Sequence, residues 1–467
     1  MIRKIYFSDK PLRTILVFSL IIKLTLFFFL QPWKENVVKD RMIVSDAIMY
    51  ETLAEDLVTR HSFTGSTDKP GMDPNSMYYI THQFDSLKTP GYPFFLAVIY
   101  FIFGIKPYVA VLFQIILSSI SLVILFRITN FIFQEKKISY IVCFLFAIEP
   151  HQVYYTFHIL SDTLYVTLLL LTVSFLFQGL KEKNIFLLFV TAFLSGILAL
   201  VRPIAEFLPL IFAGIIIFSK WGSLIQRIKI IFYCLILYAA VVLPWMMRNQ
   251  SVYGHFNLCT TGQYTLLMYD AAYTEASQKK LPDTVVMAQF HQQAMDEGYG
   301  NTTNPFDKSA VYAKFGGEYI KKNIFSCSKK HLEGIINMMA GIGNKNIAVY
   351  FGLEEKDTRQ NNSYSFSSNL AKIMNAKKAS EIMIGIYIAA AMGVCYLFFI
   401  YGSIQMIRSS YLYIWLAMMS VVAYHCILTG VVGVNRYKLP STPFLLIVAG
   451  YGVYFLFEKI ASKKKIK

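Results

Sequence analysis

The sequence predicts an all-α membrane protein that crosses the bilayer many times. Of its 467 residues, 55% are hydrophobic and only 15% are charged, whereas soluble globular proteins are close to about 25% charged. The mean hydropathy is +0.48. Apolar runs recur along the chain, and many approach the roughly 20 residues that a helix needs to cross a hydrocarbon core ~30 Å thick.

The positive net charge points to membrane lipid as a partner and not to nucleic acid. The chain carries a net charge of +16, but its cations gather in short segments between apolar runs and at Lys463, Lys464 and Lys465. Anionic lipid and the excess of Lys and Arg in cytoplasmic loops account for that distribution.

The chain begins with basic residues and a first apolar run, residues 14–30. This run lacks the small residues of a signal-peptide cleavage site, so we interpret it as an uncleaved helix whose N-terminus is cytoplasmic. A polar segment, residues 31–93, forms the first outer loop. Residues 93–104 are apolar but too few to cross the membrane, so we expect them to lie at the interface or to re-enter.

About ten spans follow from the apolar runs. They are residues 14–30, 108–126, 138–148, 161–180, 185–201, 203–218, 230–247, 382–404, 411–433 and 440–457. In this topology, the cytoplasmic connections hold cations such as Lys136, Lys181 and Arg227, whereas the outer turn at 149–162 holds neither Lys nor Arg. Both termini are therefore expected in the cytoplasm of a cell whose plasma (inner) membrane holds the protein.

This topology divides the chain into three regions. Residues 1–247 form an N-terminal transmembrane module, residues 248–381 a large extracytoplasmic loop domain, and residues 382–467 the last transmembrane helices. Within the loop domain, residues 310–325 have apolar side chains at helical spacing. Cys259 and Cys327 both fall in this domain and would be able to pair there if it is extracytoplasmic.

A set of charged residues next to membrane ends falls on the same, outer side. Charges at the bilayer boundary are costly unless they are paired or reach a wet cavity, so a one-sided set suggests a shared site. The set is Asp46, Lys88, Glu149, Asp162, Arg202, Arg248, Arg436 and Lys438.

Each of these residues also has a plainer interpretation. Asp46 and Asp162 fit helix N-caps, Lys88 fits a lysine that extends to lipid headgroups, and Arg202 and Arg248 fit lipid anchors. Arg436 and Lys438 are harder to explain in this way, because two cations at an outer end oppose the charge bias. Glu149, His151 and His158 invite a metal site, but their spacing matches no strong motif and favours an interfacial role.

Six short motifs in order resemble those of GT-C fold glycosyltransferases, over nearly the whole chain. The nearest branch is that of protein O-mannosyltransferases and the bacterial lipid A aminoarabinose transferase. The motifs are Asp46-Ala47 with Tyr50, Thr89-Pro90-Gly91-Tyr92-Pro93, Leu160-Ser161-Asp162, Val201-Arg202-Pro203, Pro244-Trp245 with Arg248-Asn249, and Asn435-Arg436-Tyr437-Lys438-Leu439-Pro440.

The resemblance implies a GT-C-like bundle that transfers a sugar from a polyprenyl-phosphate donor to a glycolipid, glycan or protein on the outer face, with inversion. Asp46 matches the essential acid that takes the acceptor's proton, and Asp162 matches a second acidic position. Lys88 falls where the aminoarabinose transferase has a phosphate-contacting lysine, although here it precedes Thr-Pro-Gly. The sequence establishes no cofactor requirement, and a divalent metal near Asp46 stays open, because some relatives hold one near these acids. The other ligands of that metal have no match in this sequence.

Elementary chemistry favours the same roles. A carboxylate acting as general base contributes roughly 10²–10⁴-fold in rate. A departing polyprenyl phosphate gains negative charge, which cations in a water-poor cavity stabilise. Lys88, Arg202, Arg248 and Arg436 are the candidate cations.

Two other functions stay open. A lipid-linked oligosaccharide polymerase or ligase shares the donor type but usually takes its catalytic residues from a late loop. A secondary transporter would have charges within its spans and paired halves, whereas these charges lie at outer ends.

Overall fold

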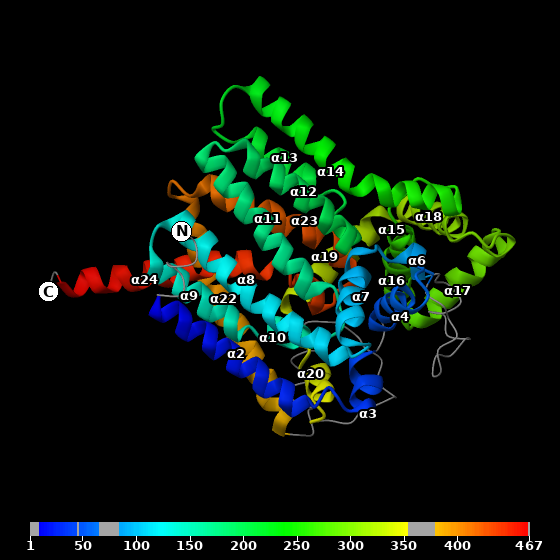
Figure 1. The fold of residues 1–467 in the computed structure, drawn as a ribbon, viewed down its shortest axis with the longest axis horizontal. Helices are drawn as coiled ribbons and strands as arrows, with labels where there is room; N and C mark the ends of the chain where they lie inside the picture. Colours follow the sequence, from blue (N-terminus) through cyan, green and yellow to red (C-terminus); the bar gives the residue numbers. More distant parts are fainter. Residues whose placement is uncertain (1–8, 44–45, 65–83, 354–378, 466–467) are drawn as a thin grey trace.

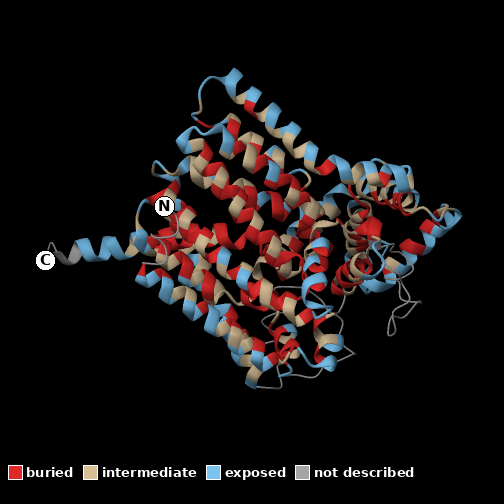
Figure 2. Ribbon diagram, viewed as in Figure 1, coloured by how far each residue is buried: buried red, intermediate tan, exposed pale blue. Residues whose placement is uncertain are grey.

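The computed structural model describes residues 9–43, 46–64, 84–353 and 379–465 (Figure 1). Within these ranges the regular structure is helical and contains no β-strand. The predicted all-α class is therefore confirmed. Figure 2 shows buried residues through the middle of the bundle and many exposed residues along its outer helices.

Among the described residues, seven helices are long and apolar enough to cross a membrane. They are α2 (Lys10–Leu30), α8 (Pro107–Phe133), α11 (Asp162–Glu182), α14 (Leu224–Tyr253), α22 (Ala379–Ile407), α23 (Leu412–Thr429, continued by η5, Gly430–Val432) and α24 (Thr442–Lys465). Three further predicted spans are shorter helices, α9 (Lys136–Ile148), α12 (Ile185–Val201) and α13 (Leu208–Ile217). A multi-pass membrane protein is confirmed, whereas the count of ten spans is not.

Exposed apolar side chains on the outer helices fit a lipid surround. In the most apolar stretch of α14, only 11% is buried inside the protein, and the share for α22 is also 11%. Phe232 of α14 and Leu397 of α22 are 60% and 70% exposed. In water such surfaces would be costly, but in a bilayer they face hydrocarbon.

The expected interfacial segment forms α7 (Gly91–Phe103), which is 13 residues long. Phe94, Phe101 and Ile102 are exposed along it, so one face of this short helix is free to meet lipid. At its start, a β-carbon added to Gly91 would lie 2.7 Å from the carbonyl oxygen of Leu200. The glycine of the Thr-Pro-Gly motif thus lets α7 approach the last turn of α12, next to Arg202.

The predicted first outer loop contains helices where it is described: α3 (Glu35–Val37), the π-helix η1 (Val38–Met42), α4 (Asp46–Thr59) and α6 (Phe84–Leu87). Helix α4 packs against α7. Its buried residues include Ala47, Tyr50, Leu53 and Ala54, at helical spacing. This packing fixes the helix that begins at Asp46.

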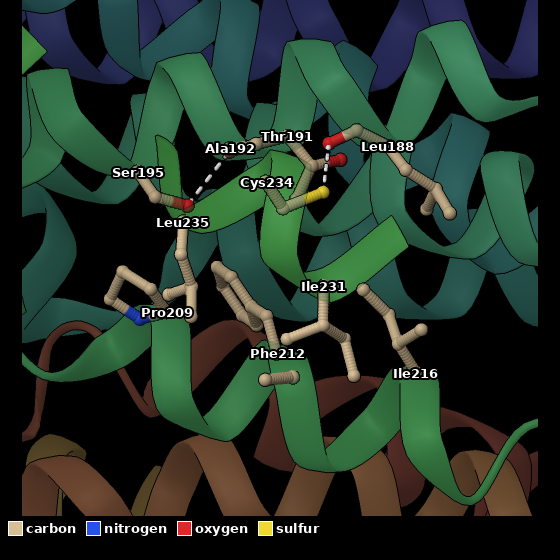
Figure 3. Close-up of a pocket in the computed structure, with 11 residues that line it drawn as sticks. Leu188, Thr191, Ala192, Ser195, Pro209, Phe212, Ile216, Ile231, Cys234 and Leu235 are labelled. Carbon is tan, nitrogen blue, oxygen red and sulfur yellow. Dashed lines mark hydrogen bonds between the residues drawn. The ribbon is translucent and has the colours of Figure 1, made fainter. Parts of the chain in front are cut away.

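Helices α12, α13 and α14 pack side by side and enclose a small cavity of about 20 Å³ lined by residues such as Leu188, Phe212 and Ile231 (Figure 3). Ser195 donates to the backbone oxygen of Thr191 at 2.7 Å. The space suits at most about one water molecule, so this side of the bundle is closely packed.

Helices α22 and α24 meet through two glycines. A β-carbon on Gly402 would lie 2.1 Å from the Val448 carbonyl oxygen, and one on Gly452 would lie 2.4 Å from that of Phe398. Small residues let membrane helices approach closely. A Gly402→Ala substitution should therefore force the backbones apart and lower the free energy of unfolding by about 1–3 kcal/mol.

Thermal melting of the two variants in detergent tests this expectation. Gly393→Ala on the same helix is the matched control, because a β-carbon there meets no atom within 4 Å. Equal melting temperatures for the two variants would contradict a close helix contact.

The segment at 248–381 has a small core of its own. Helices α15 (Thr261–Thr265), η3 (Leu266–Ala271), α16 (Ala272–Lys279), α17 (Asp283–Asp296), η4 (Tyr299–Asn301) and α18 (Pro305–Lys322) surround it, and α19 (Ile324–Ala340) and α20 (Asn344–Tyr350) follow. The predicted amphipathic stretch, residues 310–325, covers most of α18 and reaches the start of α19. Helix α18 contributes Tyr312 to the same core as Met268 and Phe290. Cys259 and Cys327 are both free thiols.

Candidate active site

Asp46 is the first residue of α4, and both of its carboxylate oxygens meet cations. Lys88 Nζ lies 3.1 Å from Oδ1, and Arg436 Nη1 lies 2.7 Å from Oδ2. The lysine comes directly after α6 and the arginine lies in η6 (Asn435–Lys438), the 3-10 turn between α23 and α24. Lys88 and Arg436, which the sequence places on separate outer segments, thus both contact the carboxylate of Asp46.

Asp162, the first residue of α11, forms the other half of the cluster. It accepts from Arg436 Nε at 2.7 Å and from Arg202 Nη1. Arg202 follows the last residue of α12, where the backbone turns extended before η2 (Pro203–Ala205). Arg436 therefore bridges the two acids, and the cluster runs Lys88, Asp46, Arg436, Asp162, Arg202.

This cluster has an excess of positive charge. Its three cations and two carboxylates leave one net positive charge. The side chain of Asp162 is 1% exposed, whereas that of Asp46 is 24% exposed. Asp46 is accordingly the acid that a second molecule can reach.

The same cations set the ionisation of Asp46. Burial alone would raise the pKa of its carboxyl, but the charges of Lys88 and Arg436 outweigh burial and hold that pKa well below 3.8. Asp46 is therefore ionised in the resting protein at neutral pH.

Tyrosine rings enclose the charges. Lys88 Nζ lies 5.2 Å from the centre of the Tyr50 ring, and the Arg202 and Arg436 guanidinium carbons each lie 5.8 Å from that of Tyr437. The Tyr50 hydroxyl is 3.2 Å from Ser161 Oγ. These rings hold the long cationic side chains in place through cation–π contacts.

Arg248 lies in a different cluster. The predicted span ends at residue 247, but α14 continues to Tyr253, so Arg248 is inside a helix. Its Nη2 is 3.2 Å from Asp85 Oδ2 and 3.2 Å from the Phe63 carbonyl oxygen. The Tyr253 hydroxyl also donates to Asp85. Of the four candidate cations, Lys88, Arg202 and Arg436 contact Asp46 or Asp162. Among the hydrogen bonds and ion pairs of the described residues, Arg248 contacts neither acid.

Sequence reasoning missed Asp85, the partner of Arg248. It lies three residues before Lys88 in the same short stretch, and that spacing alone would have marked a second acid in this outer segment. The pairing itself had no sequence signal, because the two residues are 163 positions apart.

Glu149 and the two histidines have structural partners. Glu149 caps α10 (Pro150–Tyr155) and accepts from His151 Nδ1 at 3.2 Å, while His151 Nε2 lies 3.1 Å from the Ile342 carbonyl oxygen. The His158 ring stacks on Tyr350 at 4.1 Å. These contacts give all three side chains buried structural partners inside the protein, and their interfacial role stays a prediction.

The residues around Asp46 do not fit a divalent metal. Two cations already occupy its oxygens, and the described residues contain no group of three or more His, Cys, Asp or Glu side chains able to hold an ion.

Part of the chain matches a known family. Residues 87–247 match the family model described as dolichyl-phosphate-mannose-protein mannosyltransferase. This stretch includes Lys88, Asp162 and Arg202, whereas Asp46 and Arg436 lie outside it. A search of curated proteins gives no match.

The solved structures decide the fold. The chain aligns over 99% of its length, at a TM-score of 0.54 and 12% identity, with the oligosaccharyltransferase AglB from Archaeoglobus fulgidus, in a structure that contains an inhibitory peptide and a dolichol-phosphate. The chain has the GT-C fold. It covers 52% of that AglB chain and so spans about half of AglB's length.

Two further solved structures align with this chain. A second structure of the Archaeoglobus fulgidus enzyme, tethered to an acceptor peptide, gives the same TM-score of 0.54 and 12% identity over 99% of this chain and 51% of that one. ArnT from Cupriavidus metallidurans, bound to undecaprenyl phosphate, aligns over 93% of this chain and 77% of its own at 11% identity. Its TM-score is 0.41.

Proposed function

We propose that this protein is an inverting glycosyltransferase of the membrane that moves a sugar from a polyprenyl-phosphate donor to an acceptor on the extracytoplasmic face. The observation that carries the proposal is the placement of Asp46 between Lys88 and Arg436. A partly exposed carboxylate next to converging cations offers a base for the acceptor and a site for the donor phosphate.

The excess positive charge favours an anionic group on the donor. A donor phosphodiester carries one negative charge, which equals the net charge of the five-residue cluster. Arginine can hold two phosphate oxygens at once, so Arg436 is the central phosphate contact, with Lys88 and Arg202 beside it. Arg248 forms a second cationic position, on α14, and contributes to the donor phosphate only if the donor reaches that helix.

The reaction is a single displacement. An acceptor hydroxyl gives its proton to Asp46, and its oxygen bonds to the anomeric carbon on the face opposite the phosphate. The bond from that carbon to the phosphate oxygen breaks, and polyprenyl phosphate departs with the electron pair. Cations fixed in advance around the leaving group stabilise its new charge.

Asp46 is a poor base while two cations hold it ionised. Donor phosphate would compete with Asp46 for Lys88 and Arg436, and weaker pairing would raise the pKa of the carboxyl. Binding of the donor thus activates the base. Asp162 stays buried against Arg202 and Arg436, so we assign it the positioning of both arginines.

The donor's lipid chain would remain in the bilayer. Helix α7 begins three residues after Lys88 and exposes Phe94, Phe101 and Ile102. A polyprenyl chain lying along this helix keeps its phosphate within reach of the lysine.

The pH dependence follows from the same pairing. The ratio kcat/KM reports ionisations of the free enzyme, in which the pKa of Asp46 lies below 3.8. Asp46 must be ionised to accept a proton, so the acid limb that it causes should lie below about pH 4. Lys88→Met removes one stabilising cation and should move that limb to higher pH.

Profiles of kcat/KM against pH for the wild type and Lys88→Met provide the measurement. Lys321→Met, which removes an exposed lysine at the end of α18, should leave the limb in place. An acid limb that Lys88→Met leaves unmoved would mean that Asp46 is not the titrating base.

The experiment that tests the function uses purified protein in liposomes with a panel of polyprenyl-phosphate sugars, and follows the release of free polyprenyl phosphate. Release that requires an acceptor, together with an inverted anomeric centre in the product, is the expected result. Product that keeps the donor's anomeric configuration would overturn the single displacement.

Oligosaccharide transfer is the second candidate, since the aligned AglB structures are of an oligosaccharyltransferase. Lipid-linked oligosaccharides belong in the same panel for that reason. Turnover of these donors alone, without turnover of single-sugar donors, would favour this candidate.

A further inference from the structure

A second cavity lies between α9, α22 and α24, and none of its lining residues belongs to α4, the helix that begins at Asp46. Its volume is about 340 Å³, within the ~300–1,000 Å³ typical of small-molecule sites. Apolar side chains line most of it, among them Leu145, Ala391, Val394 and Leu446. No residue of α4 or α7 is among the lining residues of this cavity.

One end of the cavity carries a buried lysine. Lys438, the last residue of η6, lines the cavity and is 3% exposed. Its Nζ lies 3.4 Å from the Met392 sulfur, which is a weak acceptor. Within the described residues Lys438 forms no ion pair within 4.0 Å, and burial lowers its pKa to about 8.

The charge of Glu149 attracts the Lys438 ammonium from beyond 4.0 Å, but the Glu149 carboxylate hydrogen-bonds to other groups. Glu149 also lines the cavity, but its two oxygens accept from His151 Nδ1 at 3.2 Å and from the Gln152 backbone N–H at 2.6 Å. A buried ammonium without a close counter-ion is costly. An anion from outside the chain would supply the missing partner.

The cavity is reached from the lipid side. Helix α22 lies at the edge of the bundle, and Tyr387 and Val394 are 48% and 50% exposed. The Tyr387 hydroxyl donates to the Ile148 carbonyl oxygen at 2.6 Å, which joins α22 to the end of α9 at the polar end of the cavity. An apolar chain can therefore enter between helices directly from the bilayer.

We propose that this cavity binds an anionic phospholipid of the surrounding bilayer, with one acyl chain in the cavity and the phosphate against Lys438. The occupant is distinct from the donor, whose phosphate belongs with Lys88 and Arg436. Since Lys438 and Arg436 share one short turn, a lipid bound at Lys438 also fixes the turn that bridges the two acids.

The test uses the full chain reconstituted in phosphatidylcholine vesicles with phosphatidylglycerol that carries a photoactivatable diazirine in one acyl chain. After irradiation, labelled peptides are mapped by mass spectrometry. We expect label on α22 near Ala391 and Cys395, and competition by unlabelled phosphatidylglycerol. Lys438→Met should reduce that label about tenfold, the effect of losing a charge-assisted hydrogen bond.

A second variant separates loss of the site from loss of the fold. Ala391→Trp fills the cavity and should abolish the label, whereas Leu397→Trp, on the same helix and 70% exposed, should keep it. Equal labelling by a diazirine phosphatidylcholine, or equal labelling of the Ala391→Trp variant, would overturn the proposal. Stronger competition by undecaprenyl phosphate than by phosphatidylglycerol would assign the cavity to a polyprenyl lipid instead. The readout does not depend on glycosyl transfer, so its failure is separate from a failure of the proposed activity.

Discussion

Replacing Asp46 by asparagine should lower kcat by about 10²–10⁴-fold, the contribution of a general base. Asparagine has nearly the same shape but cannot accept the acceptor's proton. The loss should fall on kcat more than on KM, because Lys88 and Arg436 stay available for donor phosphate. Release of polyprenyl phosphate in single-donor assays measures both constants.

The control for this substitution is Asp296→Asn, on an exposed position of α17. It removes the same charge from the outer segment and should leave the rate unchanged. Thermal melting must show that the Asp46→Asn variant is folded. A folded Asp46→Asn variant with the wild-type rate would leave Asp46 with only a structural role at the start of α4.

Replacing Arg436 by methionine should lower both the free energy of unfolding and kcat. Arg436 bridges Asp46 and Asp162 at 2.7 Å each, and its loss leaves a nearly fully buried carboxylate with one cation fewer. Breaking a buried ion pair by removing one partner costs about 3–5 kcal/mol. Loss of a preorganised cation at the leaving group costs about 10²–10³-fold in kcat.

Arg436→Lys separates the two effects. Lysine restores the charge but not the planar fork that reaches two carboxylates at once, so stability should partly recover while kcat stays low. Arg408→Met removes an exposed arginine between α22 and α23 and should change neither quantity. An Arg436→Lys variant with full activity would show that charge alone is required at this position.

The helices were predictable because each membrane span is a local run of apolar residues in the sequence. Apolar runs gave the positions of α8, α11, α22 and α24, and the short run after Pro93 gave α7. The helix ends were less well predicted. The run at 230–247 stops at the first cation, but α14 continues to Tyr253, since Arg248 finds a carboxylate in Asp85 and the helix does not need to end.

The candidate site was predictable only as a list of residues on one side. Alternation of the spans placed Asp46, Lys88, Asp162, Arg202 and Arg436 on the outer face, but nothing in the sequence specifies that Arg436 contacts both acids. That contact depends on where η6 lies against α4 and α11, which is a matter of tertiary packing. The catalytic roles of these residues remain predictions.

The bridge formed by Arg436 has a consequence for how the protein is made. Asp46 and Arg436 are 390 positions apart, and Asp162 and Arg436 are 274 apart. Both acids are therefore synthesised long before the turn that carries Arg436. Until α23 and α24 are inserted, a growing chain holds Asp162 with Arg202 but without Arg436, so the five-residue cluster cannot assemble before both of these helices are in place.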